Sequence, residues 1–198
     1  MGFNNGNGFN SNSNNQYNNN NGGGNNQQQP QQQKKNFPVG KLYGSDGIMD
    51  ISIWNAGSAM FTLIGIKQSV GKDPANGKDV YEQKPPKELP RLFLYPGDVA
   101  VIRNVLDEIN DPGAASIRFE FNNKSVLTIV GQGSSVKFTL NDNKIGERSI
   151  TFKGTKVGDK YHFGDWELIK DYCEIAYEKG KRRKLDPEEF PVNSDDNM

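Results

Sequence analysis

The segment Gly97-Asp98-Val99-Ala100-Val101-Ile102-Arg103-Asn104 returns 67 residues later as Gly164-Asp165-Trp166-Glu167-Leu168-Ile169-Lys170-Asp171, and most positions match in identity or residue character. Upstream of each copy, Met60-Phe61-Thr62-Leu63-Ile64-Gly65 corresponds to Val126-Leu127-Thr128-Ile129-Val130-Gly131, at a spacing of 66 residues. A spacing that is preserved within one residue over two separate segments indicates a duplicated structural unit. Each copy can therefore be used to interpret the other.

The composition predicts one folded domain between two disordered tails. Residues 1–36 are almost wholly Asn, Gln, Gly and Ser, and so few apolar side chains cannot offset the entropy lost on ordering the chain. The domain is predicted at 37–180, with repeat 1 at about 48–110 and repeat 2 at about 115–180. Residues 181–198 are expected to form a second disordered tail, basic at first and then acidic.

Charge and cysteine content exclude several classes of protein. The predicted domain carries 18 Lys and Arg against 19 Asp and Glu, so binding of a polyanion requires a local basic patch. A single cysteine, Cys173, allows no intrachain disulfide and no cysteine-based metal site, which favours a reducing, cytoplasmic location, with the nucleus or nucleoid as alternatives. No apolar stretch approaches eighteen residues, so neither export nor membrane spanning is expected.

The second copy has the clearer pattern of strands and helix. Residues 117–121 alternate apolar and charged side chains, residues 122–125 supply a turn, and residues 126–130 return as a second strand. Residues 136–140 and 150–153 give two further strands. A helix is then predicted from Gly164-Asp165, with one of these residues as its cap, to about Glu178, with Gly180 ending it.

The first copy follows the same order. Its hairpin is predicted at 51–54 and 60–66 around the turn 55–58, and residues 92–95 form the strand that leads into a helix from Asp98 to about Ile109. Residues 70–90 are rich in Gly, Lys and Pro, which predicts a long loop with a short strand at Val80-Tyr81. The fold class is therefore α+β: two ββββα repeats intertwined in one domain, with antiparallel sheets and with helices packed on one face.

Residues suited to catalysis are few. His162 and Cys173 are the only histidine and cysteine, and no GxSxG, HExxH, Walker-type or Rossmann glycine pattern is present. We interpret His162 as a capping or surface residue and Cys173 as a small core residue. We therefore expect that the protein is not an enzyme and that it has neither a cofactor nor a metal site.

The outward parity of the strands carries residues suited to binding. Trp54 falls on this parity in the first copy, and an exposed Trp beside cations is suited to stacking on nucleobases while Lys and Arg contact phosphates. The opposing interpretation, that Trp54 fills a core gap and that the charges only solvate the surface, has about equal weight. The candidate nucleic-acid-binding residues are Trp54, Asn55, Lys67, Arg91, Arg118, Asn122, Lys124, Lys137 and Lys153.

The repeats, with their hairpins at 51–65 and 117–131 and their helix openings at Gly97-Asp98 and Gly164-Asp165, resemble the PUR (purine-rich-element-binding) family and the Whirly-like proteins. The resemblance covers most of residues 48–180. It implies that the two repeats form one domain whose sheets bind single-stranded DNA or RNA, as a homo-oligomer. The turns lack the Arg/Lys-Gly richness of PUR repeats, and the core is not basic.

The leading prediction is therefore a single-stranded nucleic-acid-binding protein, with single-stranded DNA favoured, acting in replication, recombination or repair. The basic run Lys181 to Lys184 would add a phosphate contact or simply solvate a helix end. The acidic tail, with Glu188, Glu189, Asp195 and Asp196, would compete for the binding face or recruit replication proteins. The alternative is a protein-interaction or assembly module with a self-associating low-complexity tail and no nucleic-acid ligand. The sequence does not decide between DNA and RNA.

Overall fold

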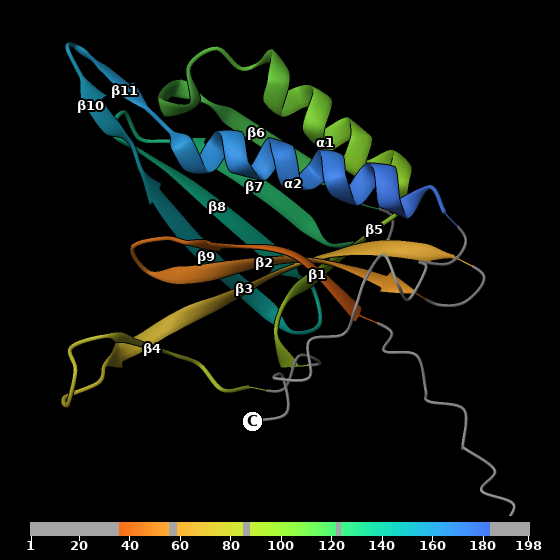
Figure 1. The fold of residues 1–198 in the computed structure, drawn as a ribbon, viewed down its shortest axis with the longest axis horizontal. Helices are drawn as coiled ribbons and strands as arrows, with labels where there is room; N and C mark the ends of the chain where they lie inside the picture. The colour runs from red at the N-terminus through yellow and green to blue at the C-terminus, as the bar shows by residue number, and fades with distance from the viewer. Residues whose placement is uncertain (1–35, 56–58, 85–87, 122–123, 183–198) are drawn as a thin grey trace, which may run out of the picture. The chain divides into compact units, whose positions relative to one another are not determined.

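The computed structural model describes residues 36–55, 59–84, 88–121 and 124–182. They lie within one unit that spans Gln33–Met198 and form an α+β fold of antiparallel sheets with two helices (Figure 1). The tails predicted at 1–36 and 181–198 lie outside this description except for Asn36, Lys181 and Arg182. So do residues 56–58 and 122–123 of the two predicted turns.

The first sheet has the order β1-β2-β3, and β3 is long enough to pair with two further strands, β4 near its end and β5 near its start. Its strands are β1 (Asn36–Tyr43), β2 (Gly47–Asn55), β3 (Met60–Lys72), β4 (Asp79–Tyr81) and β5 (Arg91–Leu94). On β2, Met49, Ile51 and Ile53 are buried and alternate with more exposed residues. This period of two gives the sheet one core face and one outward face.

The second sheet has the order β6-β7-β8-β9. Its strands are β6 (Ser116–Glu120), β7 (Val126–Gly131), β8 (Ser135–Asp142) and β9 (Gly146–Lys153). Phe119, Phe138 and Ile150 are buried, as their alternation with charged residues predicts. A separate two-stranded hairpin, β10 (Thr155–Val157) and β11 (Lys160–His162), extends from the sheet near the start of the second helix (Figure 1).

The helices α1 (Pro96–Glu108) and α2 (Gly164–Gly180) pack side by side and antiparallel (Figure 1). The indole Nε1 of Trp166 donates a hydrogen bond to the carbonyl of Leu106 at 3.3 Å, while Gly180 at the other end of α2 lies against Pro96. Asp98 accepts a hydrogen bond from the backbone N–H of Tyr95 at 3.0 Å, which fixes the start of α1. The cap predicted for α2 is wrong, because its N-cap is Phe163, which makes no side-chain cap bond.

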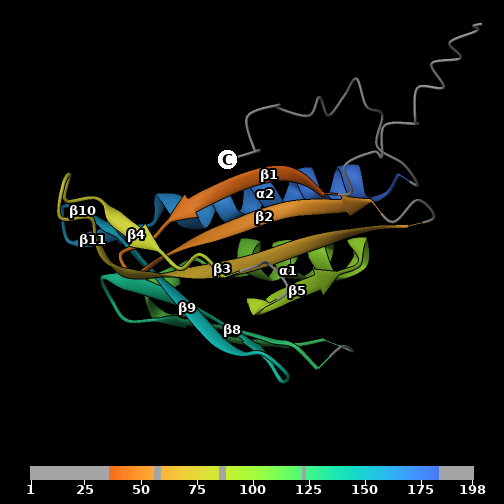
Figure 2. The same cartoon turned by 90° about the horizontal axis from the view of Figure 1, so that it is seen from below.

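The core lies between the helices and the inward faces of both sheets. α2 contacts β1, β2 and β3, and α1 contacts β3 and β5, so the helices cover one face of the first sheet. β8 and β9 cross the strands of that sheet at an angle (Figure 2). Phe138 packs edge-to-face on Phe152 and Trp166 at the centre, with ring centroids 5.5 and 6.0 Å apart.

The carboxylates of two residues help to join the sheets at this crossing. Asp46, in the turn between β1 and β2, accepts hydrogen bonds from the backbone N–H of Thr151 at 2.6 Å and from its hydroxyl at 3.0 Å. Glu82, after β4, accepts from Arg148 on β9 through both oxygens, at 2.8 and 3.1 Å. The second pair is largely buried, with side-chain exposures of 8% and 18%.

The sequence prediction missed β1, the last residues of β3 and the hairpin β10–β11. Pro38 and Gly40 disfavour a central strand, but β1 is an edge strand with an irregular register between these two residues, where both are tolerated. Gly40 is needed there, because a Cβ would run into the ring of Tyr172 on α2. The predicted loop at 70–90 begins later than expected, since residues 70–72 belong to β3.

Candidate nucleic-acid interface

The outward face of the first sheet brings together side chains from four strands. On β2, Asp50, Ser52 and Trp54 share this face, because they alternate with the buried Ile51 and Ile53. Pairing places Lys41 of β1 opposite Asp50, and Gly65 of β3 on the other side of Asp50. Gly65 in turn pairs with Arg91 of β5. The residues on this face therefore come from segments that are far apart in the sequence.

A groove of about 280 Å³ lies on this face, and we call it the first-sheet groove. Its wall includes Asp50 and Ser52 together with three cations, Lys41, Lys67 and Arg91. Gly65 contributes to the hollow because it has no side chain, and the aliphatic stem of Arg91 lies near the space that a Cβ would take. The volume is close to the lower limit of about 300 Å³ for small-ligand pockets, so only a short part of an extended ligand fits into the groove.

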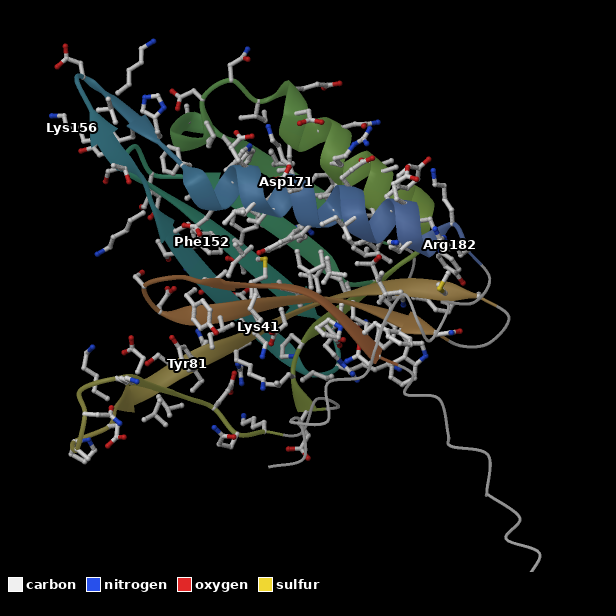
Figure 3. All side chains as sticks on the ribbon, viewed as in Figure 1. Lys41, Tyr81, Phe152, Lys156, Asp171 and Arg182 are labelled. Carbon is white, nitrogen blue, oxygen red and sulfur yellow. The ribbon has the colours of Figure 1, made fainter. Side chains whose placement is uncertain are left out.

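The cations of the first-sheet groove are available for a ligand. Lys41 and Lys67 make no ion pair with any residue in the described ranges, and the guanidinium of Arg91 lies 5.3 Å from the ring centroid of Phe93. Elsewhere Arg103, Arg118, Arg148 and Lys170 are paired with carboxylates, whereas Lys137 and Lys153 on the second sheet, like Lys41 and Lys67, make no ion pair with a described residue. Lys41 is labelled in Figure 3.

Asp50 is the one acid in the lining of this groove. Its Oδ1 atom is buried and has no hydrogen-bond partner in the described structure. Burial raises the pKa of the Asp50 carboxyl, while the charges of Lys41 and Lys67 act in the opposite direction. The groove therefore combines three cations with one poorly solvated hydrogen-bond acceptor.

Aromatic side chains lie on the same face beyond the lining of the groove. Trp54 on β2 is half-buried and pairs with Phe61 on β3, whose ring packs edge-to-face on Tyr95 with centroids 4.8 Å apart. Phe93 and Tyr95 are exposed, at 41% and 60%. Sequence reasoning did not select Lys41, Phe61, Phe93 or Tyr95. The alternation in Leu92-Phe93-Leu94-Tyr95 already placed Phe93 and Tyr95 together on the outward parity.

The predicted site residues divide between the two sheets. Trp54, Lys67 and Arg91 lie on the outward face of the first sheet, and Arg118, Lys137 and Lys153 lie on the outward face of the second. Lys124 is exposed in the turn before β7 with φ of 65°. Asn55 has the opposite parity from Trp54 and is 7% exposed, and Asn122 lies outside the described residues.

A second hollow, of about 640 Å³, lies between the hairpin β10–β11, residues 110–114 and the start of α2. Its lining includes the acids Asp111, Asp159 and Glu167 but only one lysine, Lys160. This excess of negative charge is unfavourable for a polyanion. The larger hollow is therefore the less suitable nucleic-acid site.

The histidine and the cysteine occupy unremarkable positions. His162 is exposed on β11, as predicted for a surface residue. Cys173 is fully buried in α2, and burial raises the pKa of its thiol to about 12, so it serves as a core side chain. No group of three or more His, Cys, Asp and Glu that could hold a metal ion occurs in the described part of the chain.

No protein-family model matches this sequence, and no curated protein or solved structure matches it either. Among the described residues, neither helix has the length and apolar character needed to cross a membrane.

Proposed function

We propose that this protein binds single-stranded nucleic acid through the outward face of its first sheet and has no enzymatic activity. One observation carries the proposal: Lys41, Lys67 and Arg91, which have no carboxylate partner in the described structure, line a groove on the sheet face that also carries Trp54 and the other aromatics. Cations that follow a phosphate backbone and rings that stack on bases are the two elements of non-specific single-strand binding.

The order of the elements supports the finer fold proposal, in which two ββββα repeats intertwine as in the PUR and Whirly-like families. In each half, a sheet of antiparallel strands is followed by one helix, and the two helices pack against each other. Five strands precede α1, whereas a four-stranded sheet and the hairpin β10–β11 precede α2, so the proposed repeats have diverged in detail. A role in replication, recombination or repair, and assembly as a homo-oligomer, follow only from this resemblance.

Tryptophan fluorescence tests the proposal directly, because the two tryptophans differ in position. Trp166 is 2% exposed and packs in the core, whereas Trp54 lies on the proposed interface. Titration with a single-stranded oligonucleotide at low salt should quench the emission, and Trp54→Phe should remove most of that quenching. The Trp54→Phe variant should still bind in an anisotropy assay. Its affinity should fall by no more than about tenfold, because a phenylalanine ring can also stack on bases.

Salt dependence separates nucleic-acid binding from docking of a protein on the exposed aromatics. Contacts with phosphates release counterions, so the binding constant should fall steeply as salt rises. A dissociation constant no tighter than about millimolar at low salt, or quenching that persists in Trp54→Phe, would contradict the proposed interface. Binding that is independent of salt would favour the protein-interaction alternative.

A further inference from the structure

Asp50 is an unexpected residue in a site for a polyanion. It pairs with Lys41 on one side and Gly65 on the other, and Lys67 lies two residues further along β3 from Gly65. A carboxylate in this position repels phosphates, and its buried oxygen carries a desolvation cost. A group bound in the groove that donates a hydrogen bond to the carboxylate would offset this cost.

The described structure provides no such donor. Asp50 makes no ion pair with Lys41, Lys67 or Arg91, although these cations line the same groove. Its Oδ1 has no hydrogen-bond partner. Asp50 as a whole is only partly buried and lines the groove, so its carboxylate can accept a hydrogen bond from a ligand through its second oxygen or, after rotation of the side chain, through Oδ1. The ligand's own anionic groups would then occupy the cations.

The placement of the cations indicates which part of a polynucleotide reaches Asp50. Lys41 is on one neighbouring strand and Lys67 on the other, so the two cations flank the carboxylate from both sides. If each lysine holds a phosphate, the group between two successive phosphates is the sugar. A ribose carries a 2′-hydroxyl, which can donate a hydrogen bond, and a deoxyribose carries none.

We propose that Asp50 accepts a hydrogen bond from a ribose 2′-hydroxyl, so that the first-sheet groove prefers single-stranded RNA to single-stranded DNA of the same sequence. The inference rests on the proposed function and deepens it. With DNA, the carboxylate repels the phosphates and receives no hydrogen bond that would offset this repulsion. Asp50 therefore also weakens the binding of strands that contain deoxyribose. Hydrogen bonds with a charged partner are strong enough to give a preference of about tenfold.

The test compares three labelled oligonucleotides that share the base uracil: oligo-U, oligo-dU and 2′-O-methyl oligo-U. Their dissociation constants are measured with the full chain by fluorescence anisotropy at one low salt concentration. Oligo-U should bind about tenfold more tightly than oligo-dU. The 2′-O-methyl strand should lose that advantage, because it keeps the ribose oxygen but cannot donate a hydrogen bond.

Two variants of Asp50 separate its charge from its ability to accept. Asp50→Ala should bind oligo-U and oligo-dU equally, through tighter binding of oligo-dU. Asp50→Asn keeps an acceptor oxygen and nearly the same shape, so it should tighten binding of both strands and keep part of the preference. Glu147→Ala, which removes an exposed acid on β9, is the matched control and should leave the preference unchanged.

The possible outcomes distinguish this inference from the function on which it rests. If no strand binds, the proposed function fails, and this inference fails with it. If oligo-U and oligo-dU bind equally well to the wild-type protein, nucleic-acid binding stands and the role of Asp50 is overturned. A preference for oligo-U that persists in Asp50→Ala overturns it as well. So does a preference that, when guanine or adenine strands are compared, depends on the base and not on the sugar.

Discussion

The outward faces of the two sheets look alike in sequence but differ in structure. The strands of both sheets alternate apolar residues with charged or hydroxyl residues. The outward face of the first sheet carries Lys41, Lys67 and Arg91, and that of the second carries Arg118, Lys137 and Lys153. On the second sheet, Arg118 is paired with Glu120 at 2.7 Å, and Thr128, Thr139 and Ser149 occupy the middle of the face. On the first sheet, the cations surround a groove beside exposed rings. Alternation thus defines which face is outward, whereas the groove and the neighbouring rings depend on the register of several strands and distinguish the first face from the second.

The largest expected effect comes from neutralising the cations of each face in turn. The triple variant Lys41→Gln, Lys67→Gln, Arg91→Gln should weaken single-strand binding about a hundredfold at low salt, because three phosphate contacts are lost. The slope of log K against log salt should become shallower by about 2. Both quantities are measured by anisotropy titration at several salt concentrations.

The matched control is the triple variant Arg118→Gln, Lys137→Gln, Lys153→Gln, which removes the same charge from the second sheet. It should weaken binding only a few-fold, through the loss of long-range attraction. Equal losses in the two triple variants would mean that both faces contact the strand. A larger loss in the second-sheet variant would place the interface there and remove the reason for preferring the groove.

An effect of intermediate size concerns the ion pairs of the two sheets. Glu82→Gln should lower the free energy of unfolding by about 2 kcal/mol, because Arg148 is largely buried and would lose its carboxylate. Glu120→Gln should cost less than about 0.5 kcal/mol, because the Arg118–Glu120 pair is exposed. Urea denaturation of both variants measures the difference.

The pH dependence gives a second measure of the Glu82 pair. The hydrogen bonds from Arg148 lower the pKa of Glu82, so its contribution to stability is complete above the ordinary glutamate value of about 4.3 and is lost as the pH falls through the lowered pKa. The stability gap between wild type and Glu82→Gln should therefore close in acid. A gap that stays constant down to pH 3 would mean that the charge of Glu82 does not matter.

Sequence patterns predicted the local elements of this fold well. The alternation at 117–121 and 136–140 gave β6 and β8 with the correct inward residues, and the repeated Gly-Asp segment marked the first turn of both helices. These features depend on neighbours within a few residues. The period of two along a strand, or the start of a helix, is visible in a single segment.

Features that depend on distant segments could not be predicted in this way. The path of β1 depends on Gly40, because a side chain there would clash with Tyr172, a residue more than a hundred positions away. Lys41 joins the groove only through the register of β1 on β2, so no local pattern singled it out.

Replacement of Asp50 compares a carboxylate that has hydrogen-bond donors, Glu82, with one whose buried oxygen has none. Asp50→Asn should stabilise the protein at pH 7 by about 1 kcal/mol, because the amide avoids the cost of a buried charge without a hydrogen-bond partner. That corresponds to an increase in melting temperature of about 3 °C, measured by differential scanning calorimetry. Glu82→Gln has the opposite sign at the same pH, since Glu82 has a partner.

The sign of the pH dependence at Asp50 follows from its raised pKa. Burial favours the protonated form in the folded state, so the penalty is absent below the ordinary aspartate value of about 3.9 and develops as the pH rises through the raised pKa. The gain from Asp50→Asn should therefore vanish toward pH 4. If the variant is instead less stable than wild type at pH 7, then the charges of Lys41 and Lys67 offset the cost of burying Asp50. In that case the protein itself stabilises the carboxylate, and no hydrogen-bond donor from a ligand is needed.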